Sequence, residues 1–136
     1  RLLARVLQEK LVPHVCLGVY RGQIRDEESA FQEIARAGCK QAVALVFRPT
    51  RGSRFEVWRA AVLDDAARTF RRAREILAAA KLRLGCMRPG GRYRAEVDRI
   101  AVEAGFDGIV NPVPSALRRA TEMGAVISEK HTCCVL

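Results

Sequence analysis

The sequence lacks a cysteine motif with the spacing of a metal site, although it contains five cysteines, at positions 16, 39, 86, 133 and 134. Neither CxxC nor CxxxCxxC occurs, so no metal ligand and no self-contained zinc or iron–sulfur site is predicted. A signal-peptide pattern and an apolar run long enough to span a bilayer are also missing. These absences favour a cytoplasmic protein with reduced thiols and no membrane contact.

Aromatic residues and lysine are scarce as well. Aromatic residues make up 6% of the chain, and its net charge of +9 is carried almost entirely by arginine. The arginines are spread over every predicted helix rather than gathered in one cluster, which is typical of solvated helix surfaces. With few rings on which bases can stack, a nucleic-acid partner is not favoured.

The chain has 136 residues, enough for one domain with a real core, and we expect a single domain over 1–136. It begins with Arg1 inside a predicted helix over 1–11, which suggests a fragment of a longer protein. Its last six residues, HTCCVL, have the shape of a prenylation signal, but a frayed apolar tail is the favoured interpretation.

Short apolar segments alternate with segments of helical periodicity. Strands are predicted near 13–20, 41–47, 82–88 and 107–111, and helices near 27–37, 62–80, 94–104 and 116–123. Strict alternation of this kind predicts an α/β fold with a parallel sheet. Because four strands cannot close an eight-stranded barrel, we expect parallel βα units that form half of a TIM-type barrel.

The first predicted strand, VPHVCLGVY, has two distinct faces. Val15, Leu17 and Val19 would pack against helices, whereas His14, Cys16, Gly18 and Tyr20 would face the lumen of a barrel.

The segment LRLGCMRPGGRYR, residues 82–94, predicts a strand that ends in a Pro-Gly-Gly turn before a new helix. Period-two alternation would place Cys86 and Arg88 on one face, at the carboxyl end of the strand where parallel α/β proteins carry their chemistry. We expect Arg88 to point into the lumen on the side of Cys16 and Tyr20. There its charge would grip a ligand carboxylate, a cluster or an Asp/Glu partner, and in a fragment it would be solvated or loosely paired.

Three motifs resemble the C-terminal part of biotin-synthase-related radical SAM enzymes, nearest the group that includes the archaeal-type lipoyl synthases. They are GVYRGQIRDEESAF (18–31), VFRPTRGSRFE (46–56) and LGCMRPGGRYRAEVDRIAVEAGFDGIVNP (84–112), and the last is the most specific. The resemblance implies that the chain supplies the last four strands of a TIM barrel. It also implies S-adenosylmethionine and a [4Fe–4S] cluster, which together generate a radical that abstracts a substrate hydrogen. The cluster-binding N-terminal half is absent, so a missing segment or a separate chain would have to provide it.

The resemblance also implies roles for individual residues. Gly18, Gly22 and Glu27 would lie beside the adenosyl group, and the backbone of Val46 and Phe47 would approach the adenine. The candidate catalytic residues are Arg88, Cys86, Cys16 and Tyr20. From the residues themselves, Thr50, Gly52 and Asn111 are expected to orient a ligand at neighbouring strand ends.

The predicted function is therefore radical chemistry, including sulfur insertion, on a small or carrier-bound acyl or carboxylate substrate. One alternative is a metal-free barrel lyase or aldolase with an anion site at the Gly90–Gly91 loop. A less favoured alternative is a basic RNA-binding module.

Overall fold

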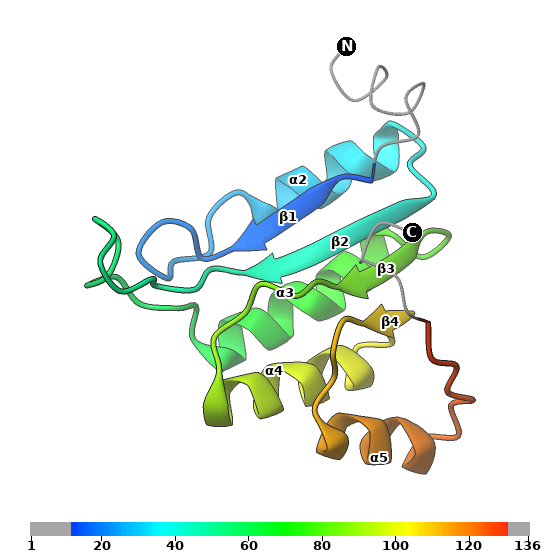
Figure 1. Cartoon of the computed structure of the whole chain (residues 1–136). Coiled ribbons are helices and arrows are strands. Elements are labelled where there is room, and N and C mark those ends of the chain that lie inside the picture. The colour runs from blue at the N-terminus through cyan, green and yellow to red at the C-terminus, as the bar shows by residue number, and fades with distance from the viewer. Residues whose placement is uncertain (1–11, 131–136) are drawn as a thin grey trace.

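A computed structural model of the chain describes residues 12–130. The helix predicted over 1–11 and the HTCCVL tail lie outside these residues. Within them, four strands form one parallel sheet in the order β1-β2-β3-β4 (Figure 1). The strands are β1 His14–Leu17, β2 Gln41–Val46, β3 Lys81–Leu84 and β4 Gly108–Ile109. The predicted parallel α/β sheet is therefore confirmed.

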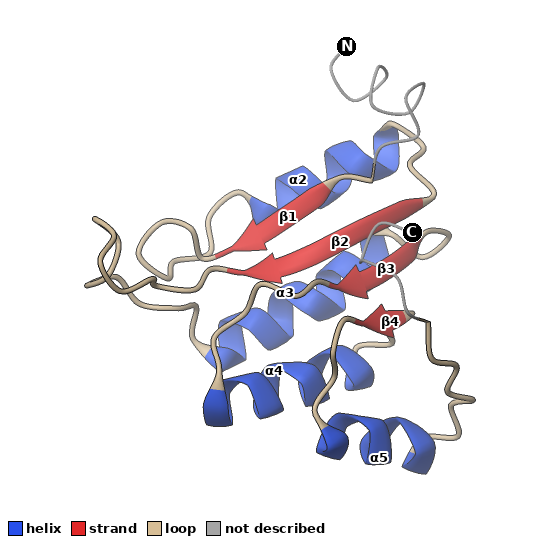
Figure 2. Cartoon of the chain, viewed as in Figure 1, coloured by secondary structure: helices blue, strands red, loops and turns tan. Residues whose placement is uncertain are grey.

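Each strand is followed by a helix, and the figures show the helices packed on one side of the sheet (Figures 1 and 2). The helices are α2 Glu27–Arg36, α3 Leu63–Ile76, α4 Gly91–Glu103 and α5 Pro114–Glu122. None of the helices in residues 12–130 is both long enough and apolar enough to cross a membrane. Consecutive βα units thus build a two-layer arrangement, with the sheet on one side and the helices on the other.

The core lies between these two layers. Val15 and Leu17 of β1 are buried against the helices, as predicted, while His14 on the opposite face is exposed. The alternate residues Leu82 and Leu84 of β3 likewise join the helix-side core. From the helices, the buried side chains include Phe31, Ile34, Phe70, Ala73, Val97 and Ala101. Burial of this apolar surface is the main source of the fold's stability.

All four strands end earlier than predicted, and this changes which side chains share a face. β1 ends at Leu17 because Gly18 has a φ of +72°, and Val19 is consequently 51% exposed instead of packed on the helices. β3 ends at Leu84 rather than at Arg88, and β4 spans two residues. The alternation assumed for Cys86 and Arg88 therefore does not apply, because both residues follow the last strand position.

Candidate functional site

The candidate site is the edge of the sheet where the four strands end. Loops 18–26 and 47–62 follow β1 and β2, and both extend beyond the arrowheads of these strands in Figure 1. Loops 85–90 and 110–113 follow β3 and β4. In parallel α/β proteins this edge carries the ligand site, because the loops can vary there without disturbing the core.

Loop 18–26 is closed by the carboxylate of Glu27, which is 7% exposed. One Glu27 oxygen accepts a hydrogen bond from the Gly18 N–H (2.8 Å), and the other accepts one from the Arg25 N–H (2.6 Å). Gly22 has a φ of +81°, and a Cβ there would lie 2.6 Å from the Ala60 carbonyl oxygen. The structure thus brings Gly18, Gly22 and Glu27 together, and Glu27 holds the loop in shape by bonding to backbone.

Four aromatic side chains gather on these two loops. Phe55 and Trp58 have ring centroids 4.7 Å apart, and Phe47 lies 6.0 Å from Trp58. Tyr20, from the first loop, lies 6.5 Å from Trp58 and is 48% exposed. We call Tyr20, Phe47, Phe55 and Trp58 the aromatic cluster. Half of the eight aromatic residues in the chain are therefore concentrated at one end of the sheet.

Arginines lie over the rings of the aromatic cluster. The guanidinium carbons of Arg25, Arg54 and Arg21 lie 3.6, 4.6 and 5.8 Å from the ring centroids of Tyr20, Phe55 and Trp58. Attraction between a cation and the negative face of an aromatic ring favours this arrangement. Arg48, Arg51 and Arg59 belong to the same two loops and are exposed. Within residues 12–130, no carboxylate forms an ion pair with any of these six arginines.

Arg88 does not occupy the position predicted for it. It is 1% exposed and forms an ion pair with Asp98 of α4, whose oxygens accept from Nε at 2.5 Å and from Nη2 at 3.1 Å. Its remaining donors reach the carbonyl oxygens of Gly85 (2.7 Å), Val110 (2.9 Å) and Asn111 (3.3 Å). The guanidinium therefore lies on the helix side and joins loops 85–90 and 110–113 to α4.

The prediction of a lumen-facing, loosely paired Arg88 in this chain is therefore wrong, although an acidic partner was among the anions expected. Asp98 is itself fully buried and also accepts a hydrogen bond from the Val113 N–H at 3.0 Å. A buried pair with this many hydrogen bonds satisfies both charges within the protein. The observed contacts of Arg88 are structural.

The two candidate thiols differ in exposure. Cys16 is half-buried on the sheet face opposite the helices, whereas Cys86 is exposed. Burial, followed by the nearby charge of Glu27, raises the pKa of the Cys16 thiol to about 11, so it is protonated at neutral pH. In the described part of the chain, no three His, Cys, Asp or Glu residues are grouped to hold a metal ion. These residues do not fit an iron–sulfur cluster, so its ligands would have to come from elsewhere.

Five further predicted ligand residues have local roles. The Val46 N–H donates to the Met87 carbonyl (3.0 Å) and the Phe47 N–H to the Leu17 carbonyl (2.9 Å), which continues the sheet. The Thr50 carbonyl accepts hydrogen bonds from the Ser53 N–H and hydroxyl, and so forms the turn that contains Gly52. Asn111, with a φ of +47°, accepts hydrogen bonds from Arg88 and Arg94 through its carbonyl oxygen.

The sequence interpretation missed the aromatic cluster. The signal was present in FRPTRGSRFEVWR, residues 47–59, where arginine and aromatic residues are interleaved within one loop. The six-percent aromatic content, averaged over the chain, concealed this local concentration. Tyr93 was missed as well: its hydroxyl donates to the Ala61 carbonyl (2.6 Å), and burial raises its pKa to about 12.

No protein-family model, curated protein sequence or solved structure matches the chain.

Proposed function

We propose that this chain is the C-terminal half of a TIM-type barrel and that loops 18–26 and 47–62 bind the adenosyl group of S-adenosylmethionine, as in biotin-synthase-related radical SAM enzymes. The observation that carries the proposal is the pairing of a glycine-containing strand end with an aromatic cluster at the same sheet edge. Gly18 and Phe47 follow adjacent strands, and the Phe47 N–H bonds to the carbonyl of Leu17. A flat purine fits against the aromatic rings there, and the glycine backbone allows it to approach closely.

The fold supports the proposal in a coarser way. Four parallel strands in sequential order, with helices on one side, are what consecutive βα units of a barrel produce. A doubly wound sheet would carry helices on both sides. The other half of the barrel would supply the cluster ligands, since the described residues do not.

The chain's own residues have defined tasks in this proposal. Glu27 keeps loop 18–26 closed through the N–H groups of Gly18 and Arg25, and the aromatic cluster offers a ring surface to the adenine. The unpaired arginines of the two loops provide positive charge for the carboxylate of a bound ligand or substrate. Cys16 and Tyr20 stay candidate catalytic residues because Cys16 lies in β1 and Tyr20 in the loop that follows it, whereas Arg88 is assigned to structure.

Equilibrium dialysis with labelled S-adenosylmethionine tests the proposal. We expect one ligand bound per chain, and about tenfold weaker binding in Phe47→Ala, since loss of one base-stacking contact is worth roughly 1–3 kcal/mol. Phe47→Tyr keeps the ring and serves as the matched control, with binding expected to stay close to that of the original chain. No binding at millimolar ligand by a chain whose circular dichroism shows it to be folded would overturn the proposal.

A further inference from the structure

The surface formed by the aromatic cluster and the arginines around it extends beyond what one adenosyl group needs. Tyr20 and Trp58 come from separate loops, and Val19, next to Tyr20, is also exposed. The two loops together contain six arginines, against Asp26 and Glu56 as their acidic residues. Glu56 accepts a hydrogen bond from the Gly52 N–H at 2.7 Å, so one of these two carboxylates is already engaged in its own loop.

The partners of the loop arginines differ from those of the ion-paired arginines on the helices. On the outer faces of the helices, Arg72 pairs with Glu28, and Arg99 pairs with Glu96 and Glu103. In the two loops, by contrast, Arg21, Arg25 and Arg54 contact aromatic rings, and no carboxylate of residues 12–130 pairs with them. Arg25 also donates two hydrogen bonds to the Gln23 side-chain oxygen, from Nε at 3.2 Å and from Nη2 at 2.9 Å. Contact with a ring uses none of the N–H donors of a guanidinium, so donors remain for an external anion.

From this geometry we infer that the aromatic cluster and its arginines bind single-stranded nucleic acid. Bases stack on the exposed Tyr20 ring and on the partly exposed rings of Phe47, Phe55 and Trp58, and the backbone phosphates accept hydrogen bonds from the guanidinium groups. Interleaved rings and cations recognise an unpaired strand because every base has a flat face and every linkage has a charge. In a duplex the bases are already stacked on one another, so the protein can reach the phosphates but not the faces of the bases.

Fluorescence anisotropy with a labelled 12-nucleotide oligouridylate, the matching DNA strand and a duplex of the same length tests the inference. We expect the single strands to bind at least about fivefold more tightly than the duplex at low salt. Tyr20→Ala should weaken single-strand binding by about tenfold, and Trp58→Phe, which keeps a ring in the loop, should weaken it less.

A charge-matched pair of variants separates this site from general attraction to a basic protein. Arg21→Gln with Arg54→Gln removes two cations from the loops, whereas Arg71→Gln with Arg118→Gln removes two exposed cations from α3 and α5. The loop pair should lower the slope of log affinity against log salt by about 1.4, the value for two lost contacts to single-strand phosphates, and the helix pair should leave it nearly unchanged.

Equal effects of the two pairs, equal affinity for duplex and single strand, or no effect of Tyr20→Ala would each overturn the inference. It does not depend on the proposed adenosyl site. Dialysis with S-adenosylmethionine and anisotropy with oligonucleotides report on the two proposals separately, so either can fail alone.

Discussion

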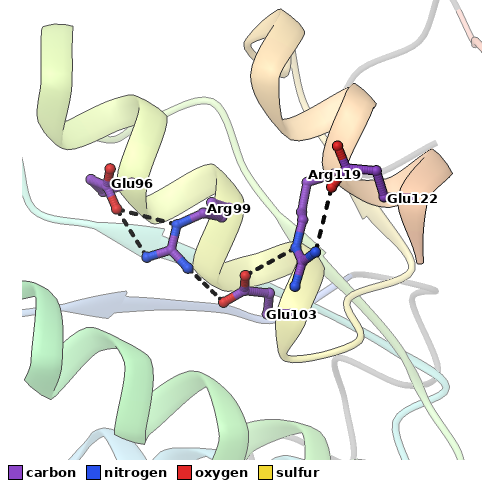
Figure 3. Close-up of polar contacts among 5 residues, drawn as sticks. All are labelled: Glu96, Arg99, Glu103, Arg119 and Glu122. Atoms are coloured by element: carbon purple, nitrogen blue, oxygen red, sulfur yellow. Dashed lines mark hydrogen bonds and ion pairs between the residues drawn. The ribbon is translucent and has the colours of Figure 1, made fainter.

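The helix layer and the loops at the carboxyl ends of β1 and β2 use arginine in opposite ways. On α4 and α5, Glu96, Arg99, Glu103, Arg119 and Glu122 form a continuous chain of alternating charges (Figure 3). In loops 18–26 and 47–62, arginines lie over rings instead. The helix arginines in these ion pairs are satisfied inside the protein and contribute to stability, whereas the loop arginines pair with no carboxylate of residues 12–130 and keep their charge for a ligand. A net charge taken over the whole chain cannot show this difference.

The largest effect is expected at Arg88, the most deeply buried of the ion-paired arginines. Asp98→Asn leaves the Arg88 guanidinium buried without its counter-charge, and we expect a loss of about 3–5 kcal/mol in the free energy of unfolding. Urea denaturation followed by circular dichroism measures this loss. Glu96→Gln on the same helix is the matched control, because that side chain is 41% exposed and its loss should cost less than about 1 kcal/mol. Similar losses in both variants would contradict the structural role of the Arg88–Asp98 pair.

Arg88→Lys sharpens the same point. If Arg88 held a ligand, as the sequence predicted, this variant would lower turnover far more than stability. In the structure, Arg88 donates hydrogen bonds to Asp98 and to the carbonyls of Gly85, Val110 and Asn111. Lysine cannot make all of these bonds, so we expect the variant to have a lower free energy of unfolding than the original chain. A variant with unchanged stability would restore the original assignment.

A smaller effect is expected in the middle of the surface network. Burial raises the pKa of Glu103, but hydrogen bonds and charges from Arg99 and Arg119 outweigh it, and the net pKa is lowered. A lowered pKa in the folded state means that the stabilisation is present at neutral pH and is lost as the pH falls through that pKa. Glu103→Gln should therefore cost about 0.5–1 kcal/mol at pH 7, and less in high salt.

Urea unfolding of the original chain and of Glu103→Gln, repeated from pH 7 down to below the ordinary glutamate pKa of about 4, measures this dependence. The two chains should converge in acid. A difference that stays constant over the whole range would mean that Glu103 stabilises the fold by packing rather than by charge.

The smallest effect is expected in the loops. Arg54→Gln removes an exposed cation–π contact with Phe55, so unfolding free energy should change by less than about 1 kcal/mol. A large loss of stability, seen as a shift of several degrees in the melting temperature, would show that the loop arginines are structural after all. Such a result would remove the contrast between the two regions.

The sequence predicted the parallel α/β sheet correctly because hydrophobic alternation depends on local neighbours. Val15 and Leu17 were assigned to the helix side correctly, since every second residue of a strand must face the core. Arg88 was assigned wrongly because the same alternation was extended past Leu84, where the strand ends. A strand end depends on pairing with neighbouring strands, and a single segment does not reveal where that pairing stops.

Asp98, the partner of Arg88, could have been predicted from the sequence. Asp98 adjoins the inward stripe of α4 that Val97 and Ala101 define, and an acid beside such a stripe points to a buried cation. The contact of Tyr20 with Trp58, in contrast, joins two loops that follow different strands. The sequence of neither loop specifies this contact by itself, because the contact depends on the parallel register of β1 and β2.

Trp58 allows the most direct test of the central claim, that loops 18–26 and 47–62 form the ligand surface, because it is the sole tryptophan of the chain. Titration of the protein with adenosine monophosphate, followed by Trp58 emission, reports on a nucleobase at the aromatic cluster. We predict saturable quenching that is strongly weakened in Tyr20→Ala and unchanged in Arg71→Gln with Arg118→Gln. Binding that calorimetry detects without any change in Trp58 emission would place the ligand elsewhere and contradict the account.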